Sequence, residues 1–210
     1  MRFAELDAVT IDGYGTLLHL TDPVPALRTT LAARGVELGK EEVARAFQAE
    51  VAYYRPHAHE GRDAASLAAL RRECVQVFLG DLGSPLEPES FVDEFMGSLV
   101  FELVPGAGET LRTLRRHDLR LGVVANWDCD LATELERLGL HGMFDTVVTS
   151  ARAGVAKPAP AIFELALREL GVRPERALHV GDEAVDEEGA RSADLAFAPA
   201  PLSAAFAGWT

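Results

Sequence analysis

The chain has 210 residues, of which 48% are hydrophobic and 25% are charged, and its formal net charge is −13. This length suits one large domain or a main domain with a smaller insert, and the lack of any apolar run of about 18 residues predicts no membrane span. The negative charge argues against nucleic acids and anionic membranes as partners, so an anionic substrate would need a local cation or metal.

The N-terminal segment MRFAELDAVTIDG is acidic within its first dozen residues and has no basic region before a long apolar stretch, so we predict no signal peptide. The two cysteines, Cys74 and Cys129, lie far apart without the spacing of a metal site. This pattern argues against a disulfide framework and favours a reducing cytoplasm. The oligomeric state cannot be read from the sequence.

Five short apolar runs are typical of buried parallel strands: AVTI (8–11), LRLGVVA (119–125), TVVT (146–149), ALHV (177–180) and LAFA (195–198). Helical patterns separate the later runs, at 107–117, 129–140 and 158–170. The last of these has a proline near its start and Gly171 past its end, which is the usual asymmetry of helix termini. The alternation predicts an α/β fold with a three-layer, Rossmann-like parallel sheet covered by helices on both faces.

The interval 20–100 breaks this alternation because it contains no convincing strand. Apolar residues recur with helical spacing in four segments: 24–35, 40–55, 64–83 and 88–99. We therefore predict a helical domain over 20–100, inserted after the first strand into a core formed by 1–19 and 101–210.

Polar side chains gather where the predicted strands end, and ligands of open α/β sheets bind beyond those carboxyl ends. The residues at these ends are three acids, an amide, a tryptophan and one of only two lysines: Asp12, Asp182, Asp186, Asn126, Trp127 and Lys157. Carboxylates collected beside a lysine make a plausible site for Mg²⁺, which takes oxygen ligands and often bridges to phosphate.

Each of these residues also has a plain structural interpretation. Asp12 is at a position typical of turns, and Asn126 could cap the following helix. Lys157, which precedes a proline, could be a solvated loop lysine. Asp182 and Asp186 could form a turn and the acidic first turn of a helix. Their occurrence together, at strand ends in chain order, favours a functional site.

In that order the motifs resemble those of the haloacid dehalogenase superfamily. DGYGTL looks like the first motif, D-x-D-G-T, and LGVVANWD resembles the second, an apolar strand that ends in Ser or Thr. AGVAKPAPAIF is similar to the third motif, and HVGDEAVDEEGA resembles the fourth, GDxxxD. The helical insert after the first motif matches the type-one cap of the family, so the resemblance covers essentially the whole chain.

The resemblance implies a nucleophile and a metal site. Asp12 would attack phosphorus or carbon and form an aspartyl intermediate that water then hydrolyses. Mg²⁺ would be held by Asp12, the backbone carbonyl of Tyr14, and Asp182 with help from Asp186. Lys157 would offset the negative charge between Asp12 and the substrate.

The resemblance also implies substrate contacts. Thr16 and Asn126 would donate hydrogen bonds near the transferred group. Trp127 is a candidate substrate contact because it follows a strand end, although packing beneath the cap is an equal alternative.

Two residues depart from the phosphatase pattern. Phosphatases of this superfamily usually carry a second aspartate two residues after the nucleophile, which protonates the leaving group and later activates water. Here that residue is Tyr14, whose phenol, with a reference pKa near 10, is a poor replacement. Ala125 replaces the Ser or Thr of the second motif, so its side chain cannot bond a phosphate oxygen.

Tyr14 resembles the L-2-haloacid dehalogenase branch, because halide needs no proton to leave. Those enzymes use no metal and lack GDxxxD, and they hold halide with a cap arginine, for which Arg45 is a candidate if it is not simply on a solvated helix face. The acidic pair favours the metal. We therefore predict a Mg²⁺-dependent phosphatase of a small phosphorylated metabolite, with a 2-haloacid dehalogenase or a low-activity superfamily relic that binds a ligand as the alternatives.

Overall fold

The chain forms two compact units in the computed structural model, which describes residues 5–140 and 142–208. The sheet unit comprises the chain up to His19 and from Glu102 onward, and the helical unit spans Leu20–Phe101. The boundaries expected from the sequence were 19/20 and 100/101. Each unit is described separately below.

The sheet unit is built on five parallel strands in the order β5-β4-β1-β6-β7. Their bounds are Ala8–Ile11 for β1, Arg120–Ala125 for β4, Thr146–Thr149 for β5, Ala177–Gly181 for β6 and Ala196–Pro199 for β7. β1 is central and pairs with β4 on one side and β6 on the other. The predicted α/β fold with a parallel sheet is confirmed.

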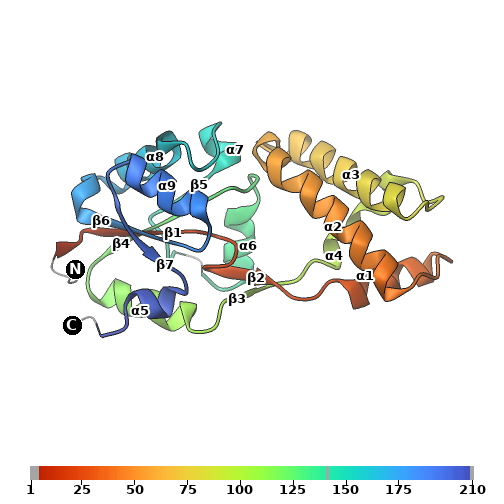
Figure 1. Ribbon diagram of the computed structural model, residues 1–210, viewed down its shortest axis with the longest axis horizontal. Coiled ribbons are helices and arrows are strands. Elements are labelled where there is room, and N and C mark those ends of the chain that lie inside the picture. The colour runs from red at the N-terminus through yellow and green to blue at the C-terminus, as the bar shows by residue number, and fades with distance from the viewer. Residues whose placement is uncertain (1–4, 141, 209–210) are drawn as a thin grey trace. The chain divides into compact units, whose positions relative to one another are not determined.

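Helices cover both faces of this sheet, which explains why its strands read as continuous apolar runs. In Figure 1, α8 (Pro160–Leu170) and α9 (Ala184–Ser192) lie on one face, and α5 (Ala107–Arg116) and α10 (Leu202–Ala205) lie on the other. Two shorter helices and a 3₁₀ turn complete the unit: α6 (Leu131–Arg137), α7 (Ser150–Ala153) and η4 (Pro174–Arg176). All four residues of β1 are buried, because both faces of the central strand are covered.

Two short strands that the sequence pattern did not predict lie where the chain passes between the units. β2 (Leu18–Leu20) and β3 (Phe101–Leu103) form a separate two-stranded sheet. Beside it, the Val104 backbone N–H donates to the Leu17 carbonyl at 3.0 Å. Three residues per strand are too few for the alternation of polar and apolar residues to be recognised.

The helical unit contains α1 (Val24–Ala33), α2 (Lys40–His57), α3 (Ala64–Asp81) and α4 (Val92–Gly97), with 3₁₀ turns η2 (Ala58–Glu60) and η3 (Pro88–Ser90). Its apolar faces meet in a core where the Phe78 ring lies 5.0 Å from Phe95 and 6.5 Å from Phe91 between centroids. Asp63 caps α3 by accepting a hydrogen bond from the Ser66 N–H at 2.9 Å. α2 runs two residues beyond the predicted end and contains Pro56 in its last turn.

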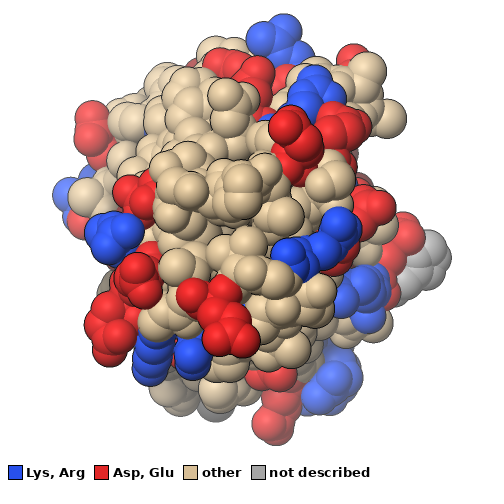
Figure 2. Space-filling model, turned by 90° about the vertical axis from the view of Figure 1, so that its right-hand side faces the viewer, with Lys and Arg blue, Asp and Glu red and all other residues tan. Residues whose placement is uncertain are grey.

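Acidic and basic side chains are interspersed over the face shown in Figure 2. The basic side chains drawn there form no continuous basic surface of the kind that binds a phosphate backbone. Among the described residues, no helix combines the length and the apolar character needed to cross a membrane.

One carboxyl group is buried inside the helical unit. Glu50 on α2 is 6% exposed, and the Cys74 thiol of α3 donates a hydrogen bond to it. Burial raises the pKa of Glu50 to about 7, and the hydrogen bond from Cys74 only partly opposes this. The folded helical unit therefore holds this proton at pH values where the unfolded chain has already lost it.

We expect Glu50→Gln to stabilise the protein more at high pH than at low pH. A folded-state pKa above the unfolded value means that stability falls as pH rises from about 4.5 to 7, and roughly 2–3 kcal/mol of this loss lies between pH 5 and pH 8. The difference in unfolding free energy between variant and wild type should rise by that amount between pH 5 and pH 8, as measured by denaturant unfolding. Glu41→Gln, an exposed position of the same helix, is the control and should show no such trend.

Candidate active site

The turn after β1 brings Asp12 against its neighbours at the carboxyl edge of the sheet. The Asp12 N–H donates to the Val180 carbonyl at 2.9 Å, and the Gly13 carbonyl accepts from the N–H groups of Leu17 and Leu18. Gly15 has a φ of +87°, and a Cβ atom there would overlap the Asp182 carboxylate. Glycine is therefore required for both conformation and close approach.

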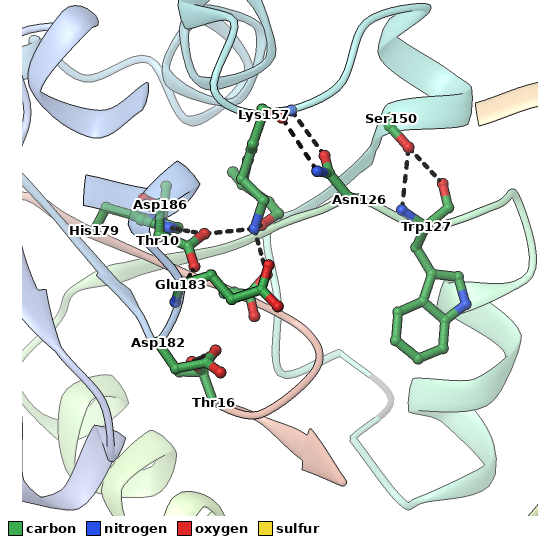
Figure 3. Close-up of polar contacts among 12 residues, drawn as sticks. Thr10, Thr16, Asn126, Trp127, Ser150, Lys157, His179, Asp182, Glu183 and Asp186 are labelled. Atoms are coloured by element: carbon green, nitrogen blue, oxygen red, sulfur yellow. Dashed lines mark hydrogen bonds and ion pairs between the residues drawn. The ribbon is translucent and has the colours of Figure 1, made fainter. Parts of the chain in front are cut away.

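Lys157 is buried between two carboxylates. Its side chain is 3% exposed, and its ammonium group donates to Asp186 at 2.6 Å (Figure 3). The same group also donates to Asp12 and to the Val124 carbonyl, the latter at 3.1 Å. All three ammonium protons thus have acceptors within the site. The alternative interpretation of Lys157 as a solvated loop lysine is wrong.

The Asn126 side chain holds the loop that carries Lys157. Its amide oxygen accepts from the Lys157 N–H at 2.7 Å, and its amide nitrogen donates to the Lys157 carbonyl at 3.2 Å (Figure 3). This pair of bonds fixes the backbone of the lysine beside the end of β4.

Asp186 is surrounded by donors. Its Oδ1 accepts from Lys157 and lies 3.2 Å from His179 Nε2, and its Oδ2 accepts from the Glu183 N–H at 3.0 Å. A Cβ atom at Gly181 would overlap this carboxylate, so a glycine is needed for Asp186 to approach the end of β6. Asp186 is 1% exposed and acts as an anchor for the lysine.

The charges of the site shift the pKa values of its members. Burial raises the pKa of Asp12 to about 7; Lys157 opposes this shift, while the charges of Asp186 and Asp182 add to it. Burial lowers the pKa of Lys157, but Asp12 and Asp186 outweigh this and the net shift is upward. Burial would raise the pKa of Asp186, yet the hydrogen bond from His179 and the charge of Lys157 hold it well below its usual range.

The donor set fits a divalent cation. Asp12, Asp182 and Asp186 each offer one oxygen, and these oxygens lie within 4.8 Å of one another. Three carboxylates face a single ammonium group, and hard oxygen ligands are those that Mg²⁺ prefers. Tyr14, whose carbonyl is a further predicted ligand, lies in the same turn, and its residue is 43% exposed.

The three predicted substrate-binding residues have hydrogen-bond partners within the protein. The Thr16 hydroxyl donates to Asp182 at 3.0 Å, and Asn126 binds the backbone of Lys157. The Trp127 residue is 9% exposed, its backbone N–H donates to Ser150 Oγ at 3.1 Å, and its indole points away from the carboxylates in Figure 3. The proposed substrate contacts of these residues stay predictions.

Sequence reasoning missed two polar residues behind the site. Thr10 on β1 and His179 on β6 are both 0% exposed, and Thr10 Oγ1 lies 2.9 Å from His179 Nδ1. Burial lowers the pKa of His179. The signal available in the sequence was a histidine inside an otherwise apolar strand, two residues before Gly181.

Arg45, the candidate halide ligand, has a partner in its own unit. Its Nε donates to the Asp81 carboxylate at 3.0 Å, and the Arg45 side chain is 61% exposed. Arg45 is thus an exposed residue on the surface of α2 that pairs with an acidic residue of the same unit.

The family model, the related sequences and the solved structures that match this chain include haloacid dehalogenase-like proteins in each comparison. The family described as haloacid dehalogenase-like hydrolases matches residues 6–194. The chain is 31% identical over 205 residues to haloacid dehalogenase-like hydrolase domain-containing protein 3 of Homo sapiens, covering 91% of this chain and 80% of that protein. It is 42% identical over 85 residues to glyceraldehyde 3-phosphate phosphatase of Methanothermobacter thermautotrophicus, covering 38% and 35%. The structure of L-2-haloacid dehalogenase from Xanthobacter autotrophicus matches with a TM-score of 0.67 at 28% identity, covering 92% and 77%.

We expect Lys157→Met to destabilise the protein by roughly 3–5 kcal/mol at pH 8, because it leaves buried carboxylates without their cation. The loss should be smaller at pH 5.5, since protonation of Asp12, whose pKa is already raised, removes one of the uncompensated charges. Denaturant unfolding at both pH values measures this. Lys40→Met replaces the other lysine, which is exposed at the start of α2, and serves as the control. An equal loss of unfolding free energy at both pH values would contradict the interpretation of Lys157 as the cation that compensates Asp12.

Proposed function

The chain belongs to the haloacid dehalogenase-like hydrolase family, and from that premise we propose that it is a Mg²⁺-dependent phosphatase of a small phosphorylated metabolite. The observation that carries the proposal is the charge count of the site. The carboxylates of Asp12, Asp182 and Asp186 gather within 4.8 Å, and Lys157 supplies one positive charge. A divalent cation would balance the excess negative charge of the three carboxylates, whereas an anionic substrate bound without a metal would add to that charge.

The proposed roles begin with Asp12 as the nucleophile. Its carboxylate oxygen forms a bond to phosphorus while the bond to the leaving oxygen breaks, and water then hydrolyses the aspartyl phosphate to return Asp12 and inorganic phosphate. Lys157 holds Asp12 in place and offsets negative charge as the phosphoryl group approaches. Asn126 keeps the lysine loop in register.

Mg²⁺ would be held by Asp12, the Tyr14 carbonyl and Asp182, with Asp186 close by. When bound, it would neutralise charge on the phosphoryl oxygens and act as a Lewis acid. The Thr16 hydroxyl, by donating to Asp182, orients one of these ligands.

Relatives support the phosphatase assignment. The protein from Methanothermobacter thermautotrophicus that matches 38% of this chain is named as a phosphatase of glyceraldehyde 3-phosphate, a small phosphorylated compound. We further propose that residues 20–100 act as the cap domain and select the substrate. The chain has only two cysteines, far apart in the sequence, and this supports a reducing, cytoplasmic setting.

The dehalogenase remains the second candidate because of Tyr14 and the structural match to L-2-haloacid dehalogenase. A haloacid brings its own carboxylate and releases halide, and a dehalogenase that uses no metal would have only Lys157 to offset these anions beside the three carboxylates. Arg45, the cation suggested for halide, is paired with Asp81. These observations favour the phosphatase.

The test is an assay of the purified protein on phosphate esters and short 2-haloacids, each with Mg²⁺ and with a chelator. We expect phosphate release with Mg²⁺, its loss with chelator, and a loss of at least about 10³-fold in Asp12→Asn, which lacks the nucleophile. Asp118→Asn, an exposed aspartate of the same unit, is the control. Halide release that persists with chelator would identify the dehalogenase instead, and a protein inactive on every substrate would favour the relic.

Tyr14 predicts a dependence on the leaving group. Without a carboxyl group at this position, activated esters such as p-nitrophenyl phosphate should be hydrolysed much better than alkyl phosphates. General acid–base catalysis is typically worth about 10²- to 10⁴-fold, so Tyr14→Asp should raise kcat for alkyl phosphates and narrow this gap. In a dehalogenase the same change should lower activity, because it adds a negative charge. Tyr14→Phe is the control and should leave the ratio between the two ester classes unchanged.

A further inference from the structure

Two buried polar side chains in the middle of the sheet lie outside the proposed chemistry. Thr10 and His179 occupy paired positions of β1 and β6, and both are fully buried. Polar groups at such positions are costly unless they are hydrogen-bonded, and the other residues of these strands are apolar or small. A pair of this kind in the centre of a sheet therefore calls for a role beyond packing.

The pair is the inner end of a hydrogen-bonded chain that reaches the nucleophile. Thr10 Oγ1 lies 2.9 Å from His179 Nδ1, and His179 Nε2 lies 3.2 Å from Asp186 Oδ1 (Figure 3). The same Oδ1 atom accepts from Lys157 Nζ at 2.6 Å, and Lys157 in turn donates to Asp12. His179 thus contacts the carboxylate that anchors Lys157, and contacts neither Lys157 nor Asp12 in these bonds.

The partners settle which ring nitrogen carries the proton toward Asp186. An ionised carboxylate only accepts hydrogen bonds, so Nε2 must be the N–H that faces Asp186. A threonine hydroxyl can donate to Nδ1, which completes the bonding of a ring with one N–H. The ring is also held by packing, because Phe163 meets it edge-on at 4.9 Å and 87°.

We propose that His179 is a positioning residue, which fixes the Asp186 carboxylate through its Nε2–H and thereby holds Lys157 against Asp12, while the Thr10 hydroxyl holds the ring from its Nδ1 side. The inference rests on the proposed function only in taking Asp12 as the nucleophile. Because His179 is fully buried, it acts through Asp186 and does not touch substrate. Residues that support a site in this way typically contribute 10- to 100-fold to activity or affinity, on the order seen for hydrogen-bonded partners of metal ligands.

Three substitutions separate the hydrogen bond from packing. Glutamine can place an amide N–H near the position of Nε2, asparagine reaches only the region of Nδ1, and leucine fills the apolar space without a donor. If His179 only packs, His179→Leu should be tolerated better than His179→Gln. If it positions Asp186, the order should reverse: His179→Gln keeps the larger part of kcat, while His179→Asn and His179→Leu lose about 10- to 100-fold with a smaller change in KM.

A second readout does not depend on activity. The chain has only two lysines, so acetic anhydride labelling followed by mass spectrometry can compare buried Lys157 with exposed Lys40 in one sample. We expect the ratio of Lys157 to Lys40 labelling to rise several-fold in His179→Leu and His179→Asn but not in His179→Gln. Exposed His117→Leu is the control. This arm stays informative if no phosphatase activity is found.

Thr10→Val keeps the ring and removes its hydroxyl partner, so it serves where a His179 variant fails to fold. In ¹⁵N NMR spectra the wild-type His179 should be protonated at Nε2 and unprotonated at Nδ1. Thr10→Val should keep the Nε2–H, because Asp186 still accepts from it, but should shift the Nδ1 resonance and raise Lys157 labelling, because the ring is held less firmly. The proposal is overturned if Lys157 labelling is unchanged in His179→Leu, or if His179→Leu is at least as active as His179→Gln.

Discussion

The site depends on one interaction, the contact of the Lys157 ammonium group with Asp12 and Asp186 in a place that water barely reaches. Burying three charges is costly, and attraction offsets this cost only when geometry is good and the remaining donors and acceptors are satisfied. The structure meets that condition locally. Asn126 fixes the backbone of Lys157, and the Val124 carbonyl accepts a hydrogen bond from the Lys157 ammonium group. The Glu183 N–H donates to the second carboxylate oxygen of Asp186.

The same interaction explains why glycines flank the acids. Carboxylates can gather at the sheet edge only if the backbone between them leaves space, and side chains at Gly15 and Gly181 would overlap Asp182 and Asp186. The glycines of the motifs DGYGTL and HVGDEAVD are therefore needed for packing, and the acidic residues of the same motifs supply the charged groups. Because β1 is central and parallel to both neighbours, the ends of β1, β4 and β6 meet at one edge without further adjustment.

The sequence predicted the elements whose burial is uniform. β1 and β5 were predicted at their observed bounds, 8–11 and 146–149, because strands covered on both faces are continuously apolar. The short strands β2 and β3 carry no such pattern. Within the site, charge type and strand-end position pointed to Asp12, Lys157, Asp182 and Asp186. Which groups bond to one another depends on side-chain geometry, which a sequence pattern does not contain. The motifs therefore do not show that Asn126 bonds the backbone of Lys157, or that His179, inside an apolar run, bonds Asp186.

The side chain of Tyr14 lies outside the hydrogen-bonded network of Asp12, Lys157 and Asp186. In the proposed chemistry, the groups that hold the nucleophile are therefore separate from the position that would transfer a proton. The Tyr14 residue is 43% exposed, whereas Asp12, Lys157 and Asp186 are each almost fully buried and bonded to one another. The proposed nucleophile Asp12, the lysine that contacts it and the carboxylate that anchors that lysine are thus assembled without any contribution from the side chain at 14. We therefore expect a change there to alter which leaving groups can depart while it leaves the buried charges in place. On this proposal the same core could serve substrates that need a proton and substrates that do not, and the fold alone does not specify the reaction.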